Sequence, residues 1–236
     1  MELSEDLSIE ALGDVLPGRP TRSYPALLST QAEALAWARA DGPAGALVVA
    51  DYQASPRGRG GLEWHAAPGQ SLGFSLVLRP RLAPAREGWL YVAATCALAD
   101  VLEGGIEWPD EIRRGGARAG SVGIDVGLGA ATTEWAVVNV LVELAPPPRT
   151  RMLARIVEAI EARSASPTEV VLADFVRRCD TIGRRVRARM APLGPGGVVV
   201  SGTAVRVLGD GALVLEQDDG RRLAVRPQKL GLLEDA

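Results

Sequence analysis

The hydrophobic periodicity of this chain changes near Arg184, and the change divides the sequence into two parts. Before that point, short apolar runs typical of strands alternate with segments that repeat at i, i+3, i+4 and i+7, as helices do. After it, only short strand-like runs remain, separated by the hairpin signals Gly209-Asp-Gly211 and Asp219-Gly220. The pattern predicts an α+β domain over residues 1–182 and a small SH3-like β-barrel over residues 183–236.

Within the first part, the pattern predicts a mixed or antiparallel sheet packed with helices. Thr30 and Glu33 have the spacing of a capping box, which predicts a helix start at Thr30. Residues 1–28 show little periodicity and are expected to form an extended lead-in. Expected strands cover 46–51, 72–78, 122–128 and 135–144, and expected helices begin near 30, 87, 153 and 167.

Composition narrows the class of protein. The net charge of −3 argues against a broad nucleic-acid surface, and no apolar run approaches the roughly 20 residues that span a bilayer. A cytoplasmic protein without membrane or nucleic-acid partners is therefore expected. Cys96 and Cys179 lie in apolar helical patterns and His65 is the only histidine, so neither a disulfide framework nor a metal site built on these residues is expected.

The basic residues are almost all arginine. Of the 26 basic residues, only Lys229 is a lysine. Arginine stays protonated and binds phosphate or carboxylate through a planar fork, but it is a poor general base. The chemistry is therefore expected to depend on fixed positive charge.

A glycine- and arginine-rich segment follows the buried strand 46–51. It contains Gln53, Arg57-Gly58-Arg59 and Trp64. Glycine lets backbone N–H groups approach an anion closely, the two arginines can add charge-assisted hydrogen bonds, and Trp64 could stack on a planar heterocycle. The segment indicates an anion-binding loop; a solvated loop with incidental arginines is the alternative.

Several motifs, in order, resemble those of the biotin protein ligase family. That family has a Ser-Thr-Asn helix start, an Ala-Asp-x-Gln strand end, a Gly-Arg-Gly-Arg-Arg-Gly loop followed by Trp, and a Lys-Trp-Pro-Asn-Asp segment. Residues 198–226 resemble its C-terminal barrel, and the likeness covers roughly residues 25–230, without the DNA-binding domain of some relatives. The corresponding segments here are Ser29-Thr30-Gln31, Ala50-Asp51-Tyr52-Gln53, Arg57-Gly58-Arg59 with Trp64, and Glu107-Trp108-Pro109-Asp110-Glu111.

The resemblance implies a catalytic domain like that of class II aminoacyl-tRNA synthetases and a two-step reaction. ATP, with Mg²⁺, would activate biotin or a lipoate-like acid as an acyl-adenylate, and a lysine of a carrier protein would accept the acyl group. Arg118 would take the place of the catalytic lysine, residues 54–63 would form a lid, and a homodimer is left open. Substrate contacts would come from Ser29, Thr30, Gln31, Gln53, Arg57, Gly58 and Arg59, and nucleotide contacts from Arg59, Trp64, Trp108, Asp110 and Asn139.

The sequence departs from the family pattern at the expected site. Pro56 and Gly60 replace a glycine and an arginine of the loop, and Glu107 reverses the charge of a lysine. Trp135 and Val137 stand where the family has glycines, so side chains are expected where a ligand would lie against backbone. These changes favour a second hypothesis, a ligase-derived module that binds an acyl compound or nucleotide without turnover.

Three other features leave alternatives open. An octanoyltransferase-like acyl transfer through Cys96 would need that thiol to be exposed and of lowered pKa. Asp125 alternates with apolar residues on a strand and could face the pocket. A run of arginines is most simply a solvated face, with a docking surface for an acidic carrier domain as the alternative; the run is Arg177, Arg178, Arg184, Arg185, Arg187 and Arg189.

Overall fold

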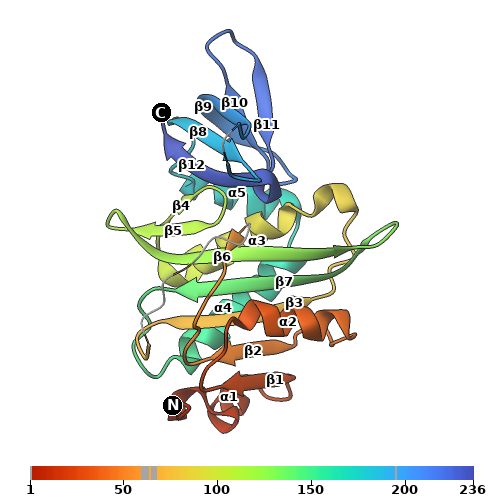
Figure 1. Ribbon diagram of the computed structural model, residues 1–236, viewed down its shortest axis with the longest axis vertical. Helices are drawn as coiled ribbons and strands as arrows, with labels where there is room; N and C mark the ends of the chain where they lie inside the picture. Colours follow the sequence, from red (N-terminus) through yellow and green to blue (C-terminus); the bar gives the residue numbers. More distant parts are fainter. Residues whose placement is uncertain (1, 60–63, 65–67, 195) are drawn as a thin grey trace.

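The computed structural model describes residues 2–59, 64, 68–194 and 196–236. Its larger sheet has seven strands in the order β1-β2-β3-β7-β6-β5-β4 (Figure 1). Among the strands of the described residues, β1 and β2 alone pair in parallel, so the sheet is mixed, as predicted. The strands are β1 Thr21–Tyr24, β2 Leu47–Ala50, β3 Leu72–Leu78, β4 Gly105–Glu107, β5 Glu111–Arg114, β6 Ala117–Leu128 and β7 Thr133–Val142.

Helices cover both faces of this sheet unequally. The helices α3 (Trp89–Leu102), α4 (Thr150–Ala165) and α5 (Thr168–Arg178) lie on one face, where α3 is buried along nearly its whole length (Figure 1). Helix α2 (Thr30–Arg39) crosses the other face, where Ala34 and Ala38 pack in one cluster with strand valines. Beyond the reach of α2, polar side chains and loop backbone can occupy that face.

The start of α2 differs from the predicted capping box. Ser29, one residue earlier, is the N-cap, and its hydroxyl accepts a hydrogen bond from the Gln31 backbone N–H at 3.2 Å. Glu33 does not return to the cap, because its carboxylate binds Arg22 and the Tyr24 hydroxyl on β1. The capping-box prediction was therefore wrong: Ser29 and not Thr30 is the N-cap, and Glu33 does not bind the cap. The Thr30 side chain instead faces the sheet.

The N-terminal segment also differs from the expected extended lead-in. It contains a 3-10 turn (Glu5–Leu7) and the short helix α1 (Ile9–Val15) before β1. Leu7 and Leu12 are buried in the main core. Asp6 accepts hydrogen bonds from the buried Arg149, at 2.7 and 3.0 Å. A helix this short is stabilised by tertiary packing rather than by its own periodicity, which explains why the sequence pattern missed it.

After α5 the chain forms the predicted short strands. Five of them make an antiparallel sheet in the order β11-β10-β9-β8-β12. A 3-10 turn, Pro227–Lys229, precedes the last strand. These strands are β8 Arg185–Met190, β9 Val199–Val207, β10 Leu213–Glu216, β11 Arg222–Val225 and β12 Leu230–Asp235.

The two sheets are held together at the β4 end of the larger one (Figure 1). The Trp108 indole N–H donates to the Gly211 carbonyl at 2.9 Å, and the Trp108 backbone N–H donates to Thr181 Oγ1 at 2.9 Å. Gln228, in the 3-10 turn before β12, donates to Glu87, just before α3, at 2.6 Å. Within the described ranges, no helix has the length and apolar character needed to cross a membrane.

Candidate functional site

A row of hydrogen-bonded side chains crosses the α2 face of the larger sheet. Gln53 Oε1 accepts from the Thr30 backbone N–H at 2.7 Å and lies 3.1 Å from Thr30 Oγ1. Ser75 Oγ lies 2.9 Å from Thr30 Oγ1 and 2.7 Å from Asn139 Oδ1. Asn139 Nδ2 donates to Asp125 Oδ2 at 3.0 Å. Thus three predicted residues, Thr30, Gln53 and Asn139, are brought together.

Strand register explains why these side chains meet. Ser75 on β3 is paired with Asn139 on β7, which is paired with Gly123 on β6. Side chains alternate along a strand, so Asp125 projects from the same face as Gly123. Gln31, in the first turn of α2, donates to Asp125 Oδ2 at 2.7 Å, so the row also includes a side chain from the helix that covers this face.

The glycine- and arginine-rich loop lies against this face. A Cβ at Gly123 would meet the Gly58 backbone at about 3.0 Å, and a Cβ at Gly58 would overlap the Trp64 ring. Glycine is therefore favoured where the loop crosses β6, because a Cβ would be tight there, and required where Trp64 covers the loop. Trp64 is itself buried. The predicted loop residues 60–63 and His65 lie outside the described residues.

Arg59 ties this loop to both sheets. Its Nε donates to Asp110 Oδ2 at 2.9 Å, and Nη1 donates to the carbonyl oxygens of Leu230 and Gly231 on β12. Both side chains of the ion pair are about 7–8% exposed. Arg59 is thus bound by protein groups, and an anionic ligand would have to compete with Asp110 for its guanidinium group. Arg57 is half-buried.

Asp110 is the most perturbed carboxyl group near the predicted site. Burial raises its pKa to about 6, and the nearby Glu111 adds to the rise. The positive charges of Arg59 and Arg118 act in the opposite direction. Arg59 and Arg118 therefore both lie within electrostatic range of one buried carboxyl group.

The raised pKa has a consequence for stability that Asp110→Asn tests. The folded state holds this proton more tightly than the unfolded chain, so the contribution of Asp110 is fully present below pH about 4 and is lost as the pH rises to about 6. Relative to the variant, we expect the wild-type free energy of unfolding to fall by about 2 kcal/mol between about pH 4.5 and about pH 7.5. Urea titrations of both proteins at the two pH values measure this difference. A difference that does not change with pH would contradict the assignment.

Arg118, the predicted catalytic residue, projects from β6 and is 31% exposed. Its Nε donates to Glu143 Oε1 at 2.6 Å, and Nη1 lies 3.7 Å from Glu111 Oε1. The two carboxylates offset the positive charge of the guanidinium group, which stays protonated. The group is exposed enough that a phosphate of a ligand could replace one of these carboxylates as its partner. Arg118 is separate from the polar row and lies nearer to Asp110.

The other predicted positions have different environments. Trp108 is 1% exposed and inserted between the two sheets, so its ring has no face free for a nucleotide in this structure. Val137 is buried in the cluster beneath α2 and does not project into a ligand site. The Trp135 ring lies against Gly127, where any Cβ would overlap it. Of the two replaced glycines, only Trp135 can thus narrow a site on this face.

Cys96 does not meet the requirements for acyl transfer. It is fully buried in α3, and burial raises the pKa of its thiol to about 11. An attacking thiol needs the reverse, exposure and a lowered pKa. The arginine run also favours the solvated-face interpretation, since nearly all its members form ion pairs within the chain; the pairs are Arg177–Asp174, Arg178–Asp100, Arg184–Asp235, Arg184–Glu107, Arg185–Asp218 and Arg189–Glu234.

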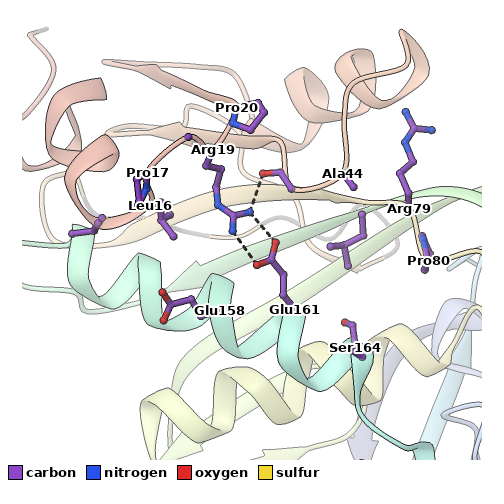
Figure 2. Close-up of a pocket in the computed structure, with 15 residues that line it drawn as sticks. Leu16, Pro17, Arg19, Pro20, Ala44, Arg79, Pro80, Glu158, Glu161 and Ser164 are labelled. Atoms are coloured by element: carbon purple, nitrogen blue, oxygen red, sulfur yellow. Dashed lines mark hydrogen bonds and ion pairs between the residues drawn. The ribbon is translucent and has the colours of Figure 1, made fainter.

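A cavity of about 640 Å³ lies elsewhere, between the segment before β1 and helix α4 (Figure 2). Its main polar group, Arg19, forms a two-point ion pair with Glu161 at 2.8 and 2.9 Å and donates to the Gly45 carbonyl at 3.0 Å. None of the residues predicted for the site lines this cavity. We therefore place the candidate site on the α2 face.

Sequence reasoning missed Ser75 and left Asp125 unassigned. Both are polar residues on otherwise apolar strands, and that contrast is the only signal the sequence offers. Their role in the row depends on the pairing of β3, β7 and β6, which brings residues 75, 125 and 139 side by side. The register between strands that are distant in the sequence cannot be predicted from any single segment.

Comparison with known proteins agrees with this architecture. The chain is 30% identical over 218 residues to the biotin–[acetyl-CoA-carboxylase] ligase of Mycobacterium tuberculosis, covering 80% of each protein. It is 36% identical over 104 residues to the bifunctional ligase/repressor BirA of Bacillus subtilis, a match covering 42% of this chain and 31% of BirA. No protein-family model matches the chain.

Solved structures show the same fold. The biotin protein ligase of Aquifex aeolicus in complex with biotin and ATP superposes with a TM-score of 0.67 at 18% identity, covering 92% of this chain and 99% of that one. A biotin protein ligase-like protein of unknown function from Silicibacter gives a TM-score of 0.68 at 16% identity, covering 90% and 96%. The fold is that of the biotin protein ligases. With the sequence identity to the mycobacterial enzyme, this chain belongs to the biotin protein ligase family.

Proposed function

We propose that this protein is a biotin–protein ligase, which activates the carboxylate of biotin with ATP and transfers the acyl group to a lysine of a carrier protein. In the first step a carboxylate oxygen bonds to the α-phosphorus of ATP and pyrophosphate leaves. In the second step the lysine amine bonds to the acyl carbon and AMP leaves. Residues 1–182 would carry the chemistry, and residues 183–236 would form the β12 side of the site.

The observation that carries the proposal is the combination of the polar row with two arginines, Arg59 and Arg118, whose charges both act on Asp110. The row from Gln53 to Asp125 offers neutral and acidic hydrogen-bonding groups to the polar ring of the acid. Arg57, Arg59 and Arg118 would neutralise the negative charge of the carboxylate and phosphates as the mixed anhydride forms. The fold holds Arg59 and Arg118 in place, and they would stabilise the transition state as the developing negative charge replaces their carboxylate partners.

Mg²⁺ would enter with the nucleotide rather than occupy a site of its own. Among the described residues, no group of three or more His, Cys, Asp or Glu side chains is placed to hold a metal ion. Mg²⁺ in nucleotide sites commonly keeps several waters and binds phosphates with only one or two carboxylates. Glu111, beside Arg118, is the described carboxylate best placed to contribute.

Pyrophosphate release tests the proposal. Purified protein with ATP, Mg²⁺ and biotin is expected to release pyrophosphate, and addition of a biotin carboxyl carrier domain should give a carrier heavier by one biotinyl group in mass spectrometry. The same carrier with its acceptor lysine changed to alanine is the control and should stay unmodified. Biotin binding in calorimetry without any pyrophosphate would instead support the second hypothesis, a binding module without turnover.

A further inference from the structure

We infer that Asp125 is a specificity-determining residue, which selects an acid whose ring carries N–H donors and rejects one that carries none. The inference rests on the proposed function and concerns the acyl half of its site. Asp125 lies on β6 between Gly123, which the loop covers at Gly58, and Gly127, which the Trp135 ring covers. Its carboxylate thus stands on the α2 face between these two walls.

Asp125 sets the direction of the hydrogen bonds at its end of the row. An ionised carboxylate can only accept, so both Asn139 and Gln31 must present their NH₂ groups to Oδ2. The Asn139 carbonyl oxygen then faces Ser75, which must donate its hydroxyl proton to it. At the other end, Gln53 Oε1 is committed to the Thr30 backbone N–H.

With the hydrogen bonds of the row directed in this way, three polar atoms remain available to a ligand. Asp125 Oδ1 and Gln31 Oε1 are acceptors, and Gln53 Nε2 is a donor; the described residues give none of the three a partner. None of the three belongs to the unpartnered polar atoms that are sealed from solvent. A cyclic urea, with two N–H donors and one carbonyl acceptor, supplies the complementary groups. The dithiolane ring of lipoate supplies no N–H, and a site built for such donors discriminates strongly against it.

Asp125→Asn is the sharpest test because it preserves shape. Its amide oxygen can still accept from Asn139 and Gln31. Its NH₂ group takes the place of Oδ1, so a donor faces the N–H of the ligand and that hydrogen bond is lost. We expect the Kd for biotin, measured by calorimetry without ATP, to rise at least about tenfold with the melting temperature unchanged. Desthiobiotin, which keeps the cyclic urea, should lose the same factor. In turnover, KM for biotin should rise while kcat changes little.

Two further variants complete the test. Asp41→Asn removes the same charge from a fully exposed side chain, so binding should not change. Asp125→Ala removes the acceptor altogether, and biotin binding should weaken at least as much. Unchanged biotin affinity in Asp125→Asn would overturn the inference even if the wild type releases pyrophosphate. Wild-type biotin binding without pyrophosphate would refute the proposed function and leave the inference standing, whereas no biotin binding by the wild type would refute both.

Discussion

Replacing Arg118 with alanine is expected to lower kcat for pyrophosphate release by about 100- to 1,000-fold. Arg118 is held on β6 by Glu143 and Glu111, so its charge is fixed before the substrates arrive. Removing a preorganised positive charge costs transition-state stabilisation more than ground-state binding, so KM for biotin should change much less than kcat. Steady-state pyrophosphate release with varied biotin measures both.

Two controls make this result specific. Arg118→Lys keeps a positive charge at the position where the family has a lysine and is expected to retain activity to within about tenfold. Arg113 on β5 is the register partner of Arg118 and also pairs with Glu111. Arg113→Ala therefore removes a neighbouring cation with a similar ion pair, and it should leave kcat nearly unchanged. Equal losses in Arg113→Ala and Arg118→Ala would show only a general electrostatic effect.

Trp108→Ala is expected to lower the free energy of unfolding by about 3–5 kcal/mol. Trp108 is a large, fully buried side chain, and its indole N–H bonds the C-terminal sheet at Gly211. The substitution leaves a cavity between the two sheets and an unpartnered carbonyl group. Urea unfolding followed by circular dichroism measures the loss.

Trp108→Phe separates the two causes. It retains most of the packing and removes the hydrogen bond to Gly211, so a loss of about 1–3 kcal/mol is expected. If Trp108→Ala stays within 1 kcal/mol of the wild type, the ring does not hold the two sheets together. In that case Trp108 would again be free to serve as the nucleotide contact that the family resemblance implies.

Local pattern was sufficient for most elements. The alternation at 72–78 and the helical repeat at 153–160 predicted β3 and α4, and the hairpin signals at 209–211 and 219–220 predicted the C-terminal strands. Apolar residues recur there with the period of the element itself. The elements missed, α1, β1, β4 and β5, are short and depend on neighbours far along the chain, such as Arg149 for the N-terminal segment.

The sequence by itself determined the family, because short motifs such as Ser29-Thr30 and Arg57-Gly58-Arg59 are local and keep their order. Only the tertiary structure decided which of these residues act together. In the folded structure Arg59 binds Asp110 and β12, and Trp108 is buried between the two sheets. Ser75 and Asp125 belong to the hydrogen-bonded row. Contacts of this kind depend on strand register and on the packing of two sheets, and neither is encoded in the spacing of residues along one segment.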